Sequence, residues 1–319
     1  MQTVRKCRSV IMNRDVSNRL IWINGEILNV NTAKINVLSP TSQYGLNVFE
    51  GIPCYYNGDN GKLYAFRLAD HYNRLCRSAK LLGIDSEYSE KQMRKALVDV
   101  VKANAYREDL SVRQTLFVED FGNWCSSGPV GMFVAPIPKN RMNKEYNRQG
   151  LDICISSWRR IDENTLSPRI KCGANYINSR MAQREAIKNG YDTCVLLNNS
   201  GKIAEAPGSC MFAVKGGELI TPLLTDSVLE SITRDTVIKI AADLGVAVKE
   251  RSVDRTELYS CDEAFLCGSA MGITPILSVD KYPVSNAAGD ITEKIRTAYL
   301  EAARGKDEKH KDWVTSIYD

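Results

Sequence analysis

The pattern of apolar and polar positions begins with two short strand-like runs, at 20–24 and 27–31. The dipeptide Asn24-Gly25 separates their apolar residues, and both of its members tolerate the positive φ that tight hairpin turns require. The pattern therefore predicts a β-hairpin near the start of the chain.

Two amphipathic helices are predicted next, because apolar residues recur there at helical spacing. The first begins after Arg67, and Gly83 is placed to stop it. The second begins at Ser89, where Gln92 completes a capping box. The expected buried faces carry Leu68, Tyr72, Leu75, Ala79 and Leu82 in the first helix, and Met93, Ala96, Leu97, Val100 and Val101 in the second.

The remaining chain alternates short apolar runs, bounded by turn residues, with longer helical periods. Strands are expected at 112–118, 131–136, 151–156, 193–197, 202–206, 209–214 and 263–267. Helices are expected at 175–189, at 233–244 with Thr233 as the N-cap, and at 293–304. The charged tail from Gly305 is expected to be a mobile or packed surface segment.

A break in this pattern divides the chain in two. Residues 137–149 contain Pro138, several basic residues and few apolar ones, as is typical of a linker. A length of 319 residues is sufficient for two ordinary domains. We therefore expect one domain over 1–136 and a second over 150–319.

Composition argues against several classes of function. The net charge of +4 gives no electrostatic basis for binding nucleic acid or a membrane surface, and no apolar run of about 18 residues would span a bilayer. The ten cysteines form no regular framework and residues 1–8 introduce no signal peptide, so we expect reduced thiols in the cytoplasm. With only His71 and His310, a metal site and a Ser-His-Asp triad are both disfavoured, and lysine is the obvious group for proton transfer.

Four segments carry the candidate chemistry. They are 167–176 with Lys171 at a strand-to-helix junction, 201–209 with Glu205, 229–234, and 268–270. Each residue alone is also typical of a surface charge, an ordinary turn or a helix start. In this order and spacing, however, the segments resemble the signature of the class IV aminotransferases, which bind pyridoxal phosphate (PLP). Within that class they most resemble the branched-chain amino acid aminotransferases.

The resemblance implies a two-domain α/β (α+β) protein of fold type IV, with a smaller N-terminal α/β domain, a larger β-rich C-terminal domain, and PLP in the cleft between them. Lys171 would hold the cofactor aldehyde covalently and then move protons. Glu205 would keep the ring nitrogen protonated through its opposite charge. The other implied cofactor contacts are Arg67, Ile232, Thr233 and Ser269 at the phosphate, Tyr176 at the phenolic oxygen, and Leu229 on the ring face.

The implied reaction moves an amino group between an α-amino acid and a 2-oxo acid, in a ping-pong exchange through the aminated cofactor. The implied substrate contacts are Tyr44, Phe49, Arg113, Ser269 and Ala270. A homodimer is also implied, because in this family the Tyr44 loop and the 121–127 loop reach the neighbouring subunit's site.

Two positions depart from the branched-chain pattern. Pro53 stands where the family usually has an arginine, directly after the segment 49–52. Ser111 stands where the family usually has a tyrosine, two residues before Arg113. Both missing groups help to recognise substrate carboxylates, so the branched-chain specificity stays open. The alternatives are a D-amino acid aminotransferase, an aminodeoxychorismate-type lyase that uses the same lysine for elimination, and a catalytically silent PLP-binding protein.

Overall fold

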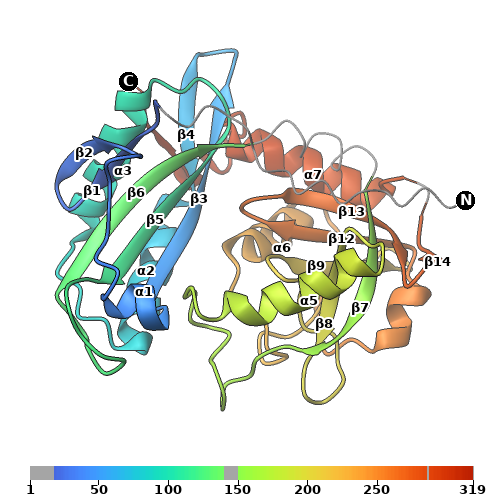
Figure 1. The fold of residues 1–319 in the computed structure, drawn as a ribbon. Coiled ribbons are helices and arrows are strands. Elements are labelled where there is room, and N and C mark those ends of the chain that lie inside the picture. The colour runs from blue at the N-terminus through green and yellow to red at the C-terminus, as the bar shows by residue number, and fades with distance from the viewer. Residues whose placement is uncertain (1–17, 140–149, 286, 319) are drawn as a thin grey trace, which may run out of the picture.

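The computed structural model describes residues 18–139, 150–285 and 287–318. Two β-sheets lie side by side, one built mostly from the first half of the chain and one from the second, and helices cover both (Figure 1). The expected mixed α/β fold is therefore confirmed. Among the helices of the described residues, none is both long and apolar enough to cross a membrane.

The first sheet has seven strands in the order β15-β4-β3-β5-β6-β1-β2, and all neighbours are antiparallel. Its strands are β1 (Leu20–Ile23), β2 (Glu26–Asn29), β3 (Asn47–Asn57), β4 (Lys62–Phe66), β5 (Leu110–Val118), β6 (Val130–Pro138) and β15 (Val314–Ser316). The associated helices are α1 (Pro40–Tyr44), α2 (Leu68–Leu82) and α3 (Glu90–Asn104).

The period of two in β3 gives this sheet two different faces. Val48, Ile52 and Cys54 point into a core shared with the apolar faces of α2 and α3. Phe49 and Gly51 point the other way, toward the second half of the molecule, where they line a cavity. One face of the sheet thus supplies stability and the other is available for a site.

The local signals read from the sequence in this half are confirmed. Asn24 and Gly25 both have positive φ, at 47° and 102°, in the turn between β1 and β2. Gly83 ends α2 in the left-handed conformation, at φ 72°. Ser89 and Gln92 form the reciprocal capping box of α3.

The second sheet has eight strands, seven of them in the order β11-β10-β9-β12-β13-β7-β8, with β14 paired to β13. Its strands are β7 (Leu151–Arg159), β8 (Thr193–Leu197), β9 (Cys210–Lys215), β10 (Glu218–Thr221), β11 (Val248–Glu250), β12 (Glu263–Gly268), β13 (Gly272–Val279) and β14 (Tyr282–Pro283). The helical elements here are α5 (Tyr176–Lys188), α6 (Ile232–Asp243), α7 (Asp290–Ala303), η1 (Arg255–Tyr259) and η2 (Lys311–Trp313).

Two local predictions in this half are wrong. Residues 202–206 form isolated bridges rather than a strand, because the N–H of Ile203 bonds to Val253 O while Ala206 turns back to Ser209. Thr233 does not cap α6. Ser231 is the N-cap, and its hydroxyl accepts the N–H of Arg234.

The tail after Gly305 returns to the first half of the molecule. It forms η2 and then β15, which pairs with β4 at the edge of the first sheet, so the C-terminus lies beside the N-terminal half (Figure 1). Trp313 packs against Phe66 with ring centroids 6.0 Å apart. The two halves are therefore tied together at the end of the chain, whereas most of the expected 137–149 linker falls outside the described residues.

Candidate active site

Lys171 is held at the junction between the two halves. Its backbone C=O accepts the N–H of Phe49 on β3 at 3.0 Å, and its N–H donates to Ser78 Oγ on α2 at 3.1 Å. Cys172 beside it forms an isolated bridge to Val48. The lysine thus has a fixed backbone although it lies outside regular secondary structure, and the pattern that predicted a strand-to-helix junction is confirmed by β7 before it and α5 after it.

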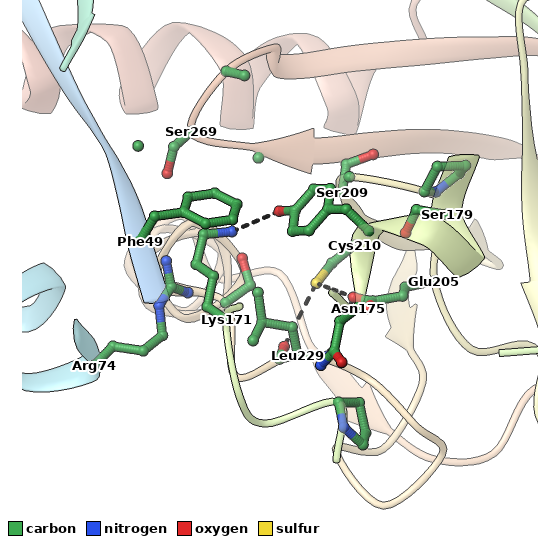
Figure 2. A pocket seen from close by; sticks show the side chains of 18 of the residues that line it. Phe49, Arg74, Lys171, Asn175, Ser179, Glu205, Ser209, Cys210, Leu229 and Ser269 are labelled. Atoms are coloured by element: carbon green, nitrogen blue, oxygen red, sulfur yellow. Dashed lines mark hydrogen bonds between the residues drawn. The ribbon is translucent and has the colours of Figure 1, made fainter. Parts of the chain in front are cut away.

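The amine of Lys171 projects between two aromatic rings. Nζ lies 5.1 Å from the ring centre of Phe49 and hydrogen-bonds to the hydroxyl of Tyr176 at 2.9 Å (Figure 2). Within the described part of the chain, no carboxylate lies within ion-pair distance of it. A lysine amine that is not committed to a salt bridge can react with an aldehyde once it has lost its proton.

A cavity of about 220 Å³ surrounds this amine. The first sheet and α2 contribute Phe49, Gly51, Arg74, Ser111 and Arg113. The second half contributes Arg160, Pro168, Ile170, Lys171, Asn175, Tyr176, Ser179, Glu205, Pro207, Gly208, Ser209, Cys210, Leu229, Ser231, Cys267, Gly268, Ser269 and Ala270. The structure therefore brings Lys171, Tyr176, Glu205, Leu229 and Ser269 together in one cavity, with Phe49, Arg113 and Ala270.

Glu205 lies deep in the cavity, and the residue is only 4% exposed. Its Oε1 is 2.7 Å from Arg160 Nη2, and its Oε2 accepts the N–H of Leu229 at 3.2 Å. The Cys210 thiol is 3.7 Å from the same oxygen (Figure 2). The carboxylate can still accept a further hydrogen bond, such as one from a protonated ring nitrogen.

The N-terminus of α6 begins next to the cavity. Ser231 lines the cavity, and Ile232 and Thr233 are the first two residues of the helix behind it. The first N–H groups of a helix have no acceptor within the helix, and the helix dipole makes that end attractive to an anion. Ile232 and Thr233 themselves are buried behind the lining, so a contribution from them would come from the backbone rather than from their side chains.

Arg67 does not take part in this cavity. Its backbone has φ 52° at the start of α2, and its guanidinium is 2.5 Å from Asp70 and 2.9 Å from Asp235. It also lies 5.1 Å from the ring centre of Trp313 in the returning tail. The geometry therefore corrects the expected phosphate contact: Arg67 connects α2 to α6 and the tail.

Arg74, two turns further along α2, lines the cavity instead. Its Nε and Nη2 each lie 2.7 Å from the carboxylate of Glu50, and its Nη1 donates to Glu230 O. Burial alone would raise the pKa of Glu50, but the charge of Arg74 and a hydrogen bond from His71 hold it well below the usual range. After the ion pair with Glu50, Arg74 still has further N–H groups, and these are cationic donors at the α2 side of the cavity.

The two departures from the branched-chain pattern are neighbours in space. Pro53 on β3 pairs directly with Ser111 on β5, and Ser111 lines the cavity while Pro53 does not. Arg113 lies two pairs further along, opposite Gly51, with its guanidinium carbon 4.0 Å from the ring centre of Phe49. Burial lowers the pKa of Arg113 from its ordinary value. Because an arginine pKa starts far above neutrality, the group still carries its charge there.

Tyr44 lies outside the cavity lining. Its ring meets that of Trp124 edge-on, with centroids 5.9 Å apart. Phe121 and Trp124 are 69% and 70% exposed, which is unusual for side chains of this size. The expected substrate contact of Tyr44 is therefore not made within the described residues of one chain.

Sequence reasoning missed Arg74 and Arg160 as members of the site. Arg74 directly precedes Leu75 but lies to one side of the apolar stripe at 68, 72, 75, 79 and 82, so helical spacing gave no signal for its burial. Arg160 lies four residues beyond the predicted strand at 151–156, and no spacing connects it to Glu205. Its role depends on how β7 and β8 pair.

Known proteins match this fold closely. The family model described as amino-transferase class IV matches residues 47–279. The branched-chain-amino-acid aminotransferase of Escherichia coli K12 is 36% identical over 303 residues, covering 93% of this chain and 97% of that protein.

Two crystal structures, both of branched-chain aminotransferases and both 40% identical, are similarly close. The enzyme of Thermoproteus uzoniensis with norvaline has a TM-score of 0.88 and covers 94% of this chain and 99% of its own. The enzyme of Thermobaculum terrenum in its PLP form has a TM-score of 0.89 and covers 95% of this chain and all of its own. Because the family model matches more than half of the chain and the similarity extends over almost its full length, this protein belongs to the class IV aminotransferase family.

Proposed function

We propose that this class IV aminotransferase uses PLP to move an amino group from an α-amino acid to a 2-oxo acid. The observation that carries the proposal is that the amine of Lys171 and the carboxylate of Glu205 line the same cavity. PLP, when bound, supplies an aldehyde for the amine and a ring that stores an electron pair. The residues present fit this molecule, because a lysine amine without a salt bridge, a buried carboxylate and the partly positive N-terminus of a helix are the partners that its aldehyde, ring nitrogen and phosphate need.

Each residue has a separate task in this proposal. Lys171 holds the aldehyde and, once released, moves a proton at the substrate Cα. Glu205 accepts the hydrogen bond of the ring N–H and keeps its proton in place by charge. The first N–H groups of α6, at Ile232 and Thr233, bind the phosphate together with the hydroxyl of Ser269 and the guanidinium of Arg74.

The substrate is proposed to differ from the branched-chain set. Proline has neither a side-chain donor nor an N–H at position 53, and the serine at position 111 is too short to place a hydroxyl where a tyrosine would. Arg113 is then the obvious cation for a carboxylate on this wall of the cavity. We infer weaker use of leucine with 2-oxoglutarate and a preference for a larger or more polar amino acid.

A cytoplasmic homodimer completes the proposal. The exposed Phe121, Trp124 and Tyr44 form an aromatic surface, which favours contact with a second copy of the chain. The free thiols of the described cysteines suit a reducing compartment. If loops from one chain complete the site of the other, a dissociated monomer is inactive. Sedimentation and activity at matched concentrations test this, and an active monomer contradicts the shared site.

A screen of amino donors with cofactor absorbance tests the function itself. The PLP-loaded protein should show a visible absorption band that a suitable amino donor bleaches and a 2-oxo acid restores. A band that bleaches without restoration, with release of an unsaturated or cleaved product, would indicate elimination. A band that no amine in a broad screen changes would indicate a silent binding protein.

A further inference from the structure

The carboxylate of Glu205 has little hydrogen-bonding capacity left after its protein contacts. A carboxylate offers about four lone-pair positions. Oε2 accepts the Leu229 N–H at 3.2 Å and faces the Cys210 thiol at 3.7 Å. Oε1 is contacted by Arg160 Nη2 at 2.7 Å. About one position on Oε1 therefore remains for a ligand in the cavity.

Arg160 is fixed in place from three elements. It directly follows β7, and its backbone N–H donates to Leu197 O at the end of β8 at 2.9 Å. Its Nη1 lies 3.4 Å from both Asn178 Oδ1 and Ser179 Oγ on α5. The side chain is 8% exposed, and its Nε has no hydrogen-bond partner among the described residues. The guanidinium is therefore oriented by Glu205 and by the fold, not by solvent.

The other ionisable groups near Glu205 stay neutral or are paired elsewhere. Burial raises the pKa of Cys210 to about 12, and it raises the pKa of Cys267 on the neighbouring strand well above its ordinary value. Arg234 on α6 is engaged by Glu250 at 2.7 Å. Among the described residues, Arg160 is thus the only cation in contact with the Glu205 carboxylate.

We propose that Arg160 is a positioning residue that keeps Glu205 ionised and directs the free lone pair of Oε1 at the ring nitrogen of bound PLP. A carboxylate and a pyridine nitrogen compete for one proton, because their ordinary proton affinities are similar. A guanidinium in contact with the carboxylate makes the carboxylate the weaker base. The same charge acts on the ring nitrogen from farther away, and its effect there is smaller. The proton consequently stays on the nitrogen, where the reaction needs it.

The test compares Arg160→Lys, Arg160→Gln and Arg160→Met, with Arg159→Met as the matched control. Arg159 is adjacent and exposed, and its guanidinium donates to Asn198 O rather than to Glu205. The readout is isotope-edited infrared titration of the PLP-loaded protein, with carboxylates labelled and the Glu205 signal identified by its loss in Glu205→Gln. A carboxylate that loses an arginine partner becomes a stronger base, so the Glu205 signal of Arg160→Gln and Arg160→Met should contain more of the protonated carboxyl form than that of the wild type at the same pH.

Several outcomes distinguish this role from a purely structural one. Arg160→Lys should restore the ionised carboxylate at least in part, since it keeps the charge, and Arg159→Met should leave it unchanged. kcat should fall in the neutral variants with little change in KM for the amino donor. Arg160→Gln keeps a polar side chain at this position, so it replaces Arg160→Met as the neutral variant if Arg160→Met does not fold. A folded Arg160→Gln with an unchanged Glu205 titration would overturn the inference.

The inference rests on the proposed use of PLP, and the two can fail separately. A wild-type protein that never acquires the visible band of bound PLP would refute the proposed function. A wild-type protein with the band, alongside neutral variants whose Glu205 titration is unchanged, would refute only the role of Arg160.

Discussion

The two walls of the cavity differ in how completely their polar groups are arranged. On the wall from the second half, Glu205 has an ion pair and two hydrogen-bond donors, and the amine of Lys171 is held by Tyr176. On the wall from the first sheet, Gly51 and Ser111 present almost no side chain, and Arg113 lies against Phe49. The wall from the second half, here called the cofactor wall, has the groups that the class IV resemblance implies for binding PLP. The wall from the first sheet, here called the substrate wall, lacks the arginine and the tyrosine of the branched-chain pattern, at Pro53 and Ser111.

This difference suggests which features are fixed by the reaction and which by the substrate. Proton transfer at Cα needs one amine and one charged carboxylate in set positions, whatever side chain the substrate carries. Substrate recognition depends on a few donors on a sheet surface, where an exchange such as Pro53 or Ser111 leaves the backbone register intact. The substrate wall can therefore change without disturbing the chemistry.

The largest effect is expected at the cofactor wall, from Lys171→Ala. The variant loses the amine that holds the cofactor aldehyde and moves the proton, so turnover should be almost abolished and the visible band of lysine-bound cofactor should disappear. Absorbance and activity of the purified variant measure both. A normal band would assign the covalent link to another lysine.

Glu205→Gln should give the next largest effect. Glutamine preserves size and can still hydrogen-bond, but it has no charge to hold the ring proton, and Arg160 would lose its ionic partner. Loss of a proton-handling group typically costs ~10²-fold or more in rate. Turnover at saturating cofactor is the measurement, and a retained rate with retained cofactor would make Glu205 purely structural.

A pair of arginine variants tests the corrected assignment on α2. Arg74→Met should weaken cofactor binding by about 10–100-fold, the equivalent of about 1.5–3 kcal/mol for a hydrogen bond to a charged group. Arg67→Met should leave the affinity for the cofactor unchanged and lower the melting temperature, because its contacts are to Asp70, Asp235 and Trp313. Equilibrium binding of PLP to each variant measures the two affinities. A weaker affinity in Arg67→Met than in Arg74→Met would assign the phosphate contact to Arg67 instead.

The smallest effect is expected from restoring the missing donors on the substrate wall. The double variant Pro53→Arg with Ser111→Tyr should increase kcat/KM for leucine with 2-oxoglutarate by a few-fold, since one added hydrogen bond contributes about 1 kcal/mol. Ser111→Ala is the matched control and should give no gain. No gain in the double variant, despite normal folding, would mean that other side chains already perform this recognition.

Residues in local motifs could be predicted from the sequence, and residues with distant partners could not. Lys171, Glu205, Leu229 and Ser269 occur in short segments whose spacing resembles the family, and all four line the cavity. The hairpin at Asn24-Gly25 and the caps at Gly83 and Ser89 depend only on neighbouring residues, and they too are as expected.

The remaining features depend on tertiary structure. Arg67 and Arg74 lie on one helix, and only the left-handed backbone at Arg67 and the buried partner of Arg74 show which one reaches the cavity. The strand β15 has three residues and no periodicity, so its pairing with β4 comes from the return of the tail. Arg160 meets Glu205 because β7 and β8 are parallel neighbours, which no local pattern shows.

Steady-state kinetics of the PLP-loaded wild-type protein with leucine, isoleucine and valine, each with 2-oxoglutarate, test most directly the claim that the cofactor wall is complete and the substrate wall altered. The account predicts kcat/KM values below the ordinary enzyme range of roughly 10⁴ M⁻¹s⁻¹ for these donors, and a higher value for a larger or more polar amino acid in the same assay. Values at or above roughly 10⁴ M⁻¹s⁻¹ for all three would contradict it and make this protein an ordinary branched-chain aminotransferase.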